Sequence, residues 1–343
     1  MHSLPYRRGR VSERSRGDEN SVDRAAGRRW DATVSGRIHD DEADTSRDVV
    51  RALLAEQCPQ WTDLTPHQLL TTGRDNAVWR IDPPGAAPML VRLPRTDSAA
   101  RSLGTELRLL PAVAGQLPVA VPRVVHAGAP SRHFRHEWSV LTWLEGEDAW
   151  TRRADLVDPH GDELAHDLAG LSRALAAVTG VDVPSRVPGM RGGPLLPLLD
   201  DLEDWLADDR YDAAGLLDVA AVRRSAAESA EAAEDEVVPD RFVHGDLIPG
   251  NVLVGHGRLT AVIDWGGAGI GDAALDLVPA WAILSPRARQ VFREATGATD
   301  AAWLRGRAFA LQQAVGGVLY YTPKGHELGA VMRRSLDWVL SDR

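Results

Sequence analysis

The chain is nearly without lysine and cysteine. Lys324 is the only lysine among its 343 residues, and Cys58 is the only cysteine. One cysteine cannot form an internal disulfide and is typical of a reducing compartment, so we expect a cytoplasmic protein. Any role that would need a permanently charged basic side chain therefore falls to an arginine, unless Lys324 takes it.

Other absences narrow the function classes. No apolar run approaches the length of a membrane span, and the beginning of the sequence lacks the apolar stretch of a secretory signal. No cluster of residues has zinc-ligand spacing. The net charge of −10 argues against nucleic acid, so we expect neither a nucleic-acid nor a membrane partner. The 44% hydrophobic composition is enough for the core of a two-lobed enzyme.

One stretch, residues 241–265, sets polar side chains at the ends of short apolar strands. A strand-type run leads into His244 and Asp246, which flank a glycine, and Asn251 follows five residues after Asp246. A predicted hairpin comes next and ends on Asp264. Rigid strands can hold such side chains while their polar tips face a cleft.

These residue types suit phosphoryl transfer to a hydroxyl. The reaction needs a carboxylate beside the acceptor hydroxyl, together with ligands for the Mg²⁺ on the nucleotide phosphates. Asp246 offers the carboxylate, and Asn251 and Asp264 offer the hard oxygen atoms that Mg²⁺ prefers. The alternative is a plain hairpin with polar turn residues, but three such residues around one hairpin favour the catalytic interpretation.

The same residues carry a family resemblance. His244-Gly-Asp246, then Asn251, then Ile263-Asp264-Trp265 resembles the signature of the aminoglycoside phosphotransferase family, a small-molecule branch of the protein-kinase-like enzymes. The resemblance implies ATP and Mg²⁺ as cofactors, Asp246 and His244 as catalytic residues, and Asn251 and Asp264 as metal ligands. His244 is expected to fix the loop by hydrogen bonds, because Asp246 already lies where the acceptor must bind.

The resemblance also implies a fold and its division. It implies an α+β, two-lobed protein-kinase-like fold, with an antiparallel sheet plus a helix in a small N-terminal lobe and a larger, mostly helical C-terminal lobe. We expect the nucleotide-binding lobe at 47–145 and the catalytic, acceptor-binding lobe at 146–343. Residues 1–46 are rich in arginine and poor in apolar pattern, so we expect a disordered extension or an upstream start codon, with a nucleic-acid-binding arm as the alternative.

Nucleotide contacts are assigned to the small lobe by the same resemblance. A hairpin should cover the phosphates, and the strand after it, with its Arg-Leu-Pro-Arg segment, should present the cation. A helix predicted from Ala99 to Leu110, ending at Pro111, carries the acidic partner of that cation. The hinge between the lobes should hold adenine through backbone groups. The assigned residues are Arg92, Glu106, Asn76, Thr142 and Leu144.

Periodic apolar residues predict helices in the rest of the chain. Leucines at three- and four-residue steps predict one long helix around 164–175, and a loop rich in proline and glycine follows at 184–194. The next predicted helix, 198–209, has an acidic surface, which is either a solvated face or a negative rim that attracts a polyamine-like substrate. Another Ala-rich helix is predicted over 213–236.

We therefore predict an ATP-dependent phosphotransferase that acts on a hydroxyl of a small molecule. The first candidate is a cationic acceptor such as an aminoglycoside or related antibiotic. A metabolic kinase for choline, amino-alcohol or sugar substrates is an alternative, and so is a macrolide phosphotransferase, although those enzymes often carry His where this chain has Asn251. A nucleotide-binding pseudokinase scaffold is the alternative from another class. We expect a monomer or homodimer.

Overall fold

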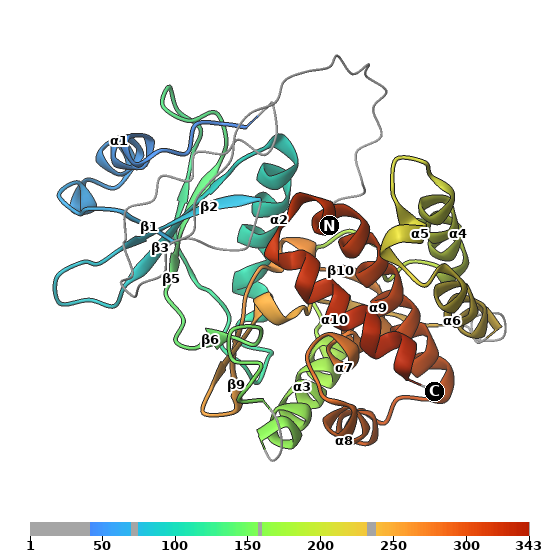
Figure 1. Cartoon of the computed structure of the whole chain (residues 1–343). Coiled ribbons are helices and arrows are strands. Elements are labelled where there is room, and N and C mark those ends of the chain that lie inside the picture. Colours follow the sequence, from blue (N-terminus) through green and yellow to red (C-terminus); the bar gives the residue numbers. More distant parts are fainter. Residues whose placement is uncertain (1–41, 70–74, 157–159, 232–237, 343) are drawn as a thin grey trace, which may run out of the picture. The chain divides into compact units, whose positions relative to one another are not determined.

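A five-stranded antiparallel sheet, with strand order β1-β2-β3-β5-β4, forms the small lobe (Figure 1). The structure is a computed structural model that describes residues 42–69, 75–156, 160–231 and 238–342. Most of the predicted N-terminal extension lies outside the described residues. The strands are β1 (His67–Leu69), β2 (Asn76–Ile81), β3 (Met89–Pro94), β4 (Val124–Gly128) and β5 (Trp138–Thr142).

Alternation along β3 explains how Arg92 comes to face away from the core of this lobe. Successive side chains of a strand point to opposite faces of the sheet. Val91 and Leu93 are fully buried in a cluster that also holds Leu53 and Leu54 of helix α1 (Arg47–Gln57). Arg92, between them in sequence, therefore lies on the other face of the sheet.

Helix α2 (Asp97–Val113) follows β3 and is longer than predicted. The hydroxyl of Thr96 caps its first turn by accepting the N–H of Ala99 at 3.2 Å. The predicted end at Pro111 is wrong, because the helix continues through this proline to Val113. Proline removes one backbone hydrogen bond from the last turn, whereas burial of Leu110 and Val113 in the hydrophobic core favours keeping that turn helical.

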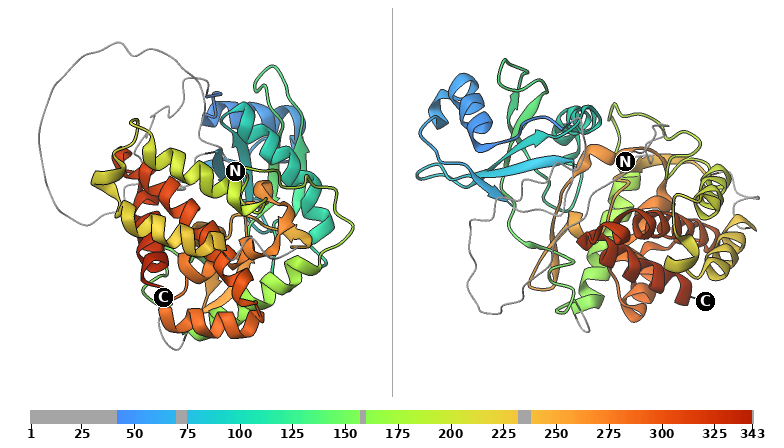
Figure 2. Two further views of the ribbon diagram at one scale, coloured as in Figure 1. Left: turned by 90° about the vertical axis from the view of Figure 1, so that its right-hand side faces the viewer. Right: turned by 45° about the horizontal axis from the view of Figure 1, so that its top comes forward.

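The large lobe is built mainly from helices. In Figure 1 and in the right-hand view of Figure 2, the sheet lies on the left and the helices α9 and α10 lie on the right. The predicted leucine stripe forms the buried face of α3, where Leu168 is fully buried. The helices of this lobe are α3 (His160–Ala177), α4 (Leu195–Ala207), α5 (Ala213–Leu216), α6 (Val219–Glu231), α7 (Pro279–Ala282), α8 (Pro286–Thr296), α9 (Asp300–Tyr321) and α10 (Glu327–Ser341).

Helix α9 forms the centre of this lobe. Buried residues are found on every side of it, 14 of its 22 in all, which is typical of a helix enclosed by others. It packs along α10, where a Cβ atom at Gly317 would collide with the side chain of Met332. Glycine at this position therefore allows the two helices to approach closely.

The single helix predicted over 213–236 is wrong in its first part, where the chain forms the two helices α5 and α6. Each begins at its own aspartate cap: Asp212 accepts the N–H of Gly215 at 3.0 Å, and Asp218 accepts that of Ala221 at 2.9 Å. Asp favours such caps over helix interiors. Residues 232–237, at the end of the prediction, lie outside the described part of the chain.

Two small sheets carry the stretch with the sequence motif. One is the pair β10-β7, and the other has the strand order β6-β8-β9. The predicted hairpin is the antiparallel pair β8 and β9. Their strands are β6 (Glu147–Asp148), β7 (Asp240–Val243), β8 (Val252–Gly255), β9 (Arg258–Val262) and β10 (Gly269–Asp272). Among the helices of the described residues, none combines the length and apolar character needed to cross a membrane.

The α3 stripe should carry much of the stability of the large lobe. We expect Leu168→Ala to lower the free energy of unfolding by about 2–5 kcal/mol, because it leaves a cavity at a fully buried site. Leu196→Ala is the matched control, since 44% of Leu196 is exposed. Urea unfolding of both variants tests this, and equal losses of stability would show that α3 is not part of the packed core.

Candidate active site

The loop after β7 is held by one buried carboxylate. The two side-chain oxygens of Asp276 accept the backbone N–H groups of His244, at 2.9 Å, and Gly245, at 3.0 Å. Burial raises the pKa of Asp276 to about 6, although these two hydrogen bonds and the charge of Arg186 work in the other direction. The carboxylate thereby fixes the backbone immediately before Asp246.

The imidazole of His244 is engaged on both nitrogens. It is fully buried; its Nε2 lies 3.2 Å from the carbonyl oxygen of Ile263, and its Nδ1 accepts the backbone N–H of Asp246 at 3.2 Å. Burial lowers the pKa of His244 to about 4, against the opposing charge of Asp246. A neutral ring, protonated on Nε2, satisfies both contacts. These contacts suit a residue that positions the loop, and its catalytic assignment stays a prediction.

Gly245 has a backbone conformation that suits glycine. Its φ of 82° lies in the left-handed region, which side chains other than glycine disfavour. A Cβ atom here would collide with the guanidinium of Arg186, which itself donates a hydrogen bond to the carbonyl of Gly267. Both backbone and space therefore require the glycine of the motif.

Asp246 and Asn251 are hydrogen-bonded to each other. The Nδ2 of Asn251 donates to Oδ2 of Asp246 at 3.0 Å and to its backbone carbonyl at 2.9 Å. The other carboxylate oxygen, Oδ1, accepts a hydrogen bond from Gln313 of α9 at 2.8 Å, and Nη2 of Arg191 lies 3.8 Å away. Because 29% of the Asp246 side chain is exposed, a ligand can reach it.

Asp264 lies next to this pair. Ile263, directly before it, donates its N–H to the carbonyl of Asn251 at 3.0 Å. Asp264 has a φ of 64°, a conformation that aspartate tolerates better than most residues. Partial loss of hydration raises its pKa to about 6; Arg92 opposes this, and the charges of Glu106 and Asp246 add to it. Since 48% of its side chain is exposed, a cation can reach the carboxylate.

Asn251 and Asp264 fit a magnesium ion as a partial ligand set. The amide nitrogen of Asn251 points to Asp246, so its side-chain oxygen is the atom suited to a metal. Mg²⁺ usually takes one or two protein ligands and completes its shell with water and phosphate oxygens. Within the described residues there is no group of three or more His, Cys, Asp or Glu side chains arranged to hold a metal alone.

Glu106 joins Arg92 to the segment that carries Asp264. One of its oxygens accepts Nη1 of Arg92 at 2.6 Å, and the other accepts the backbone N–H of Trp265 at 3.2 Å. Only 1% of the Glu106 side chain is exposed. Nη2 of Arg92 lies 3.5 Å from Oδ1 of Asp264. The predicted Arg92–Glu106 pair therefore forms, and it adjoins one of the predicted metal ligands.

The remaining predicted nucleotide contacts lie on the sheet and the hinge. Asn76 begins β2, and its side-chain oxygen is buried without a hydrogen-bond partner among the described residues. The turn before it, 70–74, lies outside the described residues. The N–H of Thr142 donates to Arg123 and that of Trp143 to Pro88, so these amides are engaged in the sheet. Leu144 is then the better candidate for a backbone contact with adenine.

Sequence reasoning missed three side chains near Asp246. Arg186 and Arg191 come from the loop between α3 and α4, and Gln313 comes from the middle of α9. The proline- and glycine-rich composition of 184–194 predicted a loop but not its position in the fold. The glutamine pair at 312–313 in a buried helix gives no signal of a site. Lys324 lies on the large lobe, with its Nζ 3.2 Å from the centre of the Tyr320 ring.

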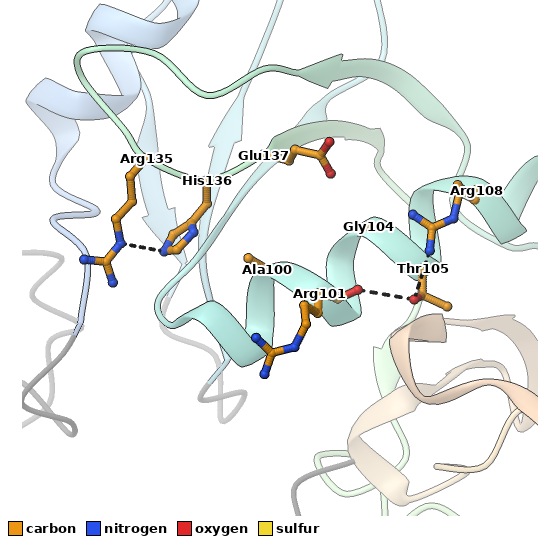
Figure 3. Close-up of a pocket in the computed structure, with 8 residues that line it drawn as sticks. All are labelled: Ala100, Arg101, Gly104, Thr105, Arg108, Arg135, His136 and Glu137. Carbon is orange, nitrogen blue, oxygen red and sulfur yellow. Dashed lines mark hydrogen bonds between the residues drawn. The ribbon is translucent and has the colours of Figure 1, made fainter. Parts of the chain in front are cut away.

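A separate pocket of about 550 Å³ lies between α2 and the segment before β5 (Figure 3). Arg101, Thr105 and Arg108 of α2 line one side, and Arg135 and Glu137 line the other. None of the predicted site residues lines this pocket, so it is distinct from the site around Asp246.

The raised pKa of Asp264 predicts how stability depends on pH. Between its ordinary value of 3.8 and about 6, the folded chain binds more protons at this group than the unfolded chain does, so its contribution to stability falls as pH rises. We expect Asp264→Asn to match wild type near pH 4 and to exceed it in the free energy of unfolding at pH 7, without metal or nucleotide. Urea unfolding at both pH values tests this; a difference that is the same at both would contradict it.

The chain is similar to a known family and to several solved structures. The model of the phosphotransferase enzyme family matches residues 67–309, and no curated protein matches the chain. The GDP complex of an aminoglycoside 2'-phosphotransferase-IIIa has a TM-score of 0.67 and 20% identity, and the match covers 87% of this chain and 99% of that one. The macrolide 2'-phosphotransferase MphH from Brachybacterium faecium has a TM-score of 0.56 and 22% identity, covering 86% and 99%.

A third similar structure contains both a nucleotide and an antibiotic. It is a thermostable mutant of aminoglycoside phosphotransferase APH(4)-Ia with AMP-PNP and hygromycin B, with a TM-score of 0.57 and 19% identity, covering 85% of this chain and 98% of that one. These likenesses confirm the predicted kinase-like α+β fold, and the family model, which matches well over half of the chain, confirms the predicted relationship. The chain belongs to the phosphotransferase enzyme family.

Proposed function

We propose that this phosphotransferase transfers the γ-phosphate of ATP to a hydroxyl of a small molecule bound at Asp246. The observation that carries the proposal is the meeting of three oxygen-bearing side chains. Asp246 accepts a hydrogen bond from Asn251 at 3.0 Å, and its charge acts on Asp264. A hydroxyl-directing carboxylate and two metal-binding oxygens beside it form the arrangement that phosphoryl transfer uses.

Asp246 orients the acceptor hydroxyl for attack. Its carboxylate lies at the end of a loop fixed by Asp276 and His244, so its position is set before the substrate binds. A loose phosphoryl-transfer transition state depends on positioning more than on early proton removal. His244 cannot take the proton directly in this arrangement, because both of its nitrogens face backbone groups.

Asn251 and Asp264 would hold Mg²⁺, and Arg92 would contact the nucleotide phosphates. When bound, Mg²⁺ neutralises charge that develops on the phosphate oxygens. Arg92 is only 11% exposed and is held by the nearly inaccessible Glu106. A fixed guanidinium loses little side-chain entropy when it binds phosphate. The hinge at Leu144 would hold the adenine ring.

An aminoglycoside or related antibiotic is the first acceptor to test. The similar structures include enzymes named for aminoglycosides. The match to the one with hygromycin B covers 85% of this chain and 98% of that one. On α4, burial and the charges of Asp204 and Asp200 raise the pKa of Asp201, so the acidic surface of this helix is a region of negative potential that would favour a cationic acceptor. Macrolides are the second candidate because of the likeness to the macrolide enzyme.

Release of the nucleoside diphosphate, ADP from ATP or GDP from GTP, with a panel of acceptors tests the function. The panel holds aminoglycosides, macrolides, choline and amino sugars, each with ATP and with GTP, because the similar structures contain both guanine and adenine nucleotides. Release above the rate in water, with at least one acceptor and only with Mg²⁺ present, is expected. A nucleotide that binds without turnover with any acceptor would favour a pseudokinase scaffold instead.

Replacing the catalytic carboxylate should separate turnover from binding. We expect Asp246→Asn to lower kcat by about 10²–10⁴-fold, because the amide can no longer accept the hydroxyl proton. The affinity for AMP-PNP should change by less than about threefold, since this side chain contacts the acceptor and not the nucleotide. Residual activity within about tenfold of wild type would remove Asp246 from the mechanism.

Removing the cation of β3 should weaken nucleotide binding. We expect Arg92→Gln to reduce affinity for Mg-AMP-PNP by about 10- to 100-fold, the equivalent of losing a charged hydrogen bond to phosphate. Arg51→Gln, on the exposed face of α1, is the control. Calorimetric titration of both variants with Mg-AMP-PNP tests this. Equal affinities of the two variants would mean that Arg92 supports the fold and does not bind phosphate.

A further inference from the structure

A largely buried arginine of the large lobe lies beside the carboxylate of Asp246. Arg191 belongs to the loop between α3 and α4, and only 15% of its side chain is exposed. Its Nη2 lies 3.8 Å from Oδ1 of Asp246. Burial lowers the pKa of Arg191, while the charges of Asp246 and Tyr321 oppose that shift. The guanidinium is therefore a cation largely removed from water beside the reacting group.

The charge of Arg191 is only partly balanced by other groups of the protein. Among the described residues its one ion pair is with Asp246, and 3.8 Å is too long for a hydrogen bond. The oxygen that it faces already accepts the amide of Gln313 at 2.8 Å. A buried charge with incomplete pairing costs stability, and such groups concentrate at sites that bind a charged ligand. The missing partner is an anion.

The other cations near the site are already bound. Arg92 is held by Glu106 at 2.6 Å and approaches Asp264, whereas Arg186 donates to the carbonyl of Gly267. The four residues from 247 to 250, Leu-Ile-Pro-Gly, contain no cation. Lys324, the only lysine, lies over Tyr320. Among the described residues, Arg191 is thus the cation beside Asp246 that is placed to bind a negatively charged group of a ligand.

We propose that Arg191 is a further catalytic residue, which binds a non-bridging oxygen of the phosphoryl group during transfer. This rests on the proposed function. The acceptor oxygen forms a bond to the γ-phosphorus while the bond from phosphorus to the bridging oxygen breaks, its electron pair leaving on ADP. The acceptor proton passes to Asp246. Arg191 makes no covalent bond; it stabilises the charge on the moving group.

Simple geometry brings the group within reach. The acceptor hydroxyl lies within hydrogen-bond distance of Asp246, and the phosphorus lies about 3–3.5 Å from that hydroxyl in a near-attack position. The phosphoryl oxygens then extend into the region next to the carboxylate, where the guanidinium of Arg191 already lies at 3.8 Å. Arg186 is close enough for its charge to act on Arg191, so the positive potential there comes from two side chains.

A planar mimic of the transferring group tests the assignment. The affinity of the full-length protein for Mg-ADP is measured by calorimetry with and without aluminium fluoride, for wild type, Arg191→Gln and Arg224→Gln. Arg224 is an exposed arginine of α6 and serves as control. Aluminium fluoride should tighten ADP binding on the order of 10²-fold in wild type and in the control, as expected of a transition-state analogue.

Arg191→Gln should lose at least about tenfold of that tightening and still bind ADP alone within about threefold of wild type. Equal tightening in Arg191→Gln and wild type, or no tightening in a wild-type protein that binds ADP, would overturn the assignment. If wild type does not bind Mg-ADP, the proposed function fails instead. Should Arg191→Gln not fold, Arg191→Lys replaces it. Lysine keeps the charge but lacks the planar pair of N–H donors of a guanidinium, so partial tightening is expected. Full tightening would overturn the assignment.

Discussion

The site depends on the two hydrogen bonds that the buried carboxylate of Glu106 accepts. One oxygen accepts Arg92 from the sheet and the other accepts the N–H of Trp265, the residue directly after Asp264. Helix α2 thereby connects strand β3, which carries the proposed phosphate-binding cation Arg92, to the segment after β9, which carries the proposed metal ligand Asp264. Because Glu106 is almost inaccessible to solvent, loss of either partner would leave a charged or polar group buried and unpaired, and this makes the arrangement a rigid one.

The loop that carries Asp246 is fixed in the same way, by hydrogen bonds from neighbouring polar groups. Asp276 accepts two successive backbone N–H groups, and His244 connects the backbone of Asp246 to that of Ile263. The glycine between His244 and Asp246 leaves room for Arg186. The carboxylate of Asp246 is therefore fixed by its neighbours although 29% of the side chain is exposed. A position set in advance would reduce the reorganisation needed in the proposed transition state.

Local spacing in the sequence was enough to predict the hairpin and the closeness of Asp246 and Asn251, because these depend on neighbours within about twenty residues. The fold class was predicted from the family resemblance that the same residues carry. Long-range partners could not be predicted this way. Arg191 and Gln313 lie far from Asp246 along the chain, and their contacts depend on how α4 and α9 pack. Helix limits failed where tertiary packing or capping outweighed pattern: α2 continues through Pro111, and Asp218 separates α6 from α5. The roles assigned to the site residues stay predictions.

The central claim is that a magnesium-bound nucleotide lies between Arg92 and Asp246, with Asn251 and Asp264 as the protein ligands of the metal. A crystal grown with AMP-PNP and Mn²⁺ in place of Mg²⁺ tests it most directly, because anomalous scattering locates the manganese independently of the model. We predict a manganese peak bonded to the side-chain oxygens of Asn251 and Asp264, with the γ-phosphate facing Asp246. Nucleotide density with its metal bound elsewhere, away from both side chains, would contradict this account.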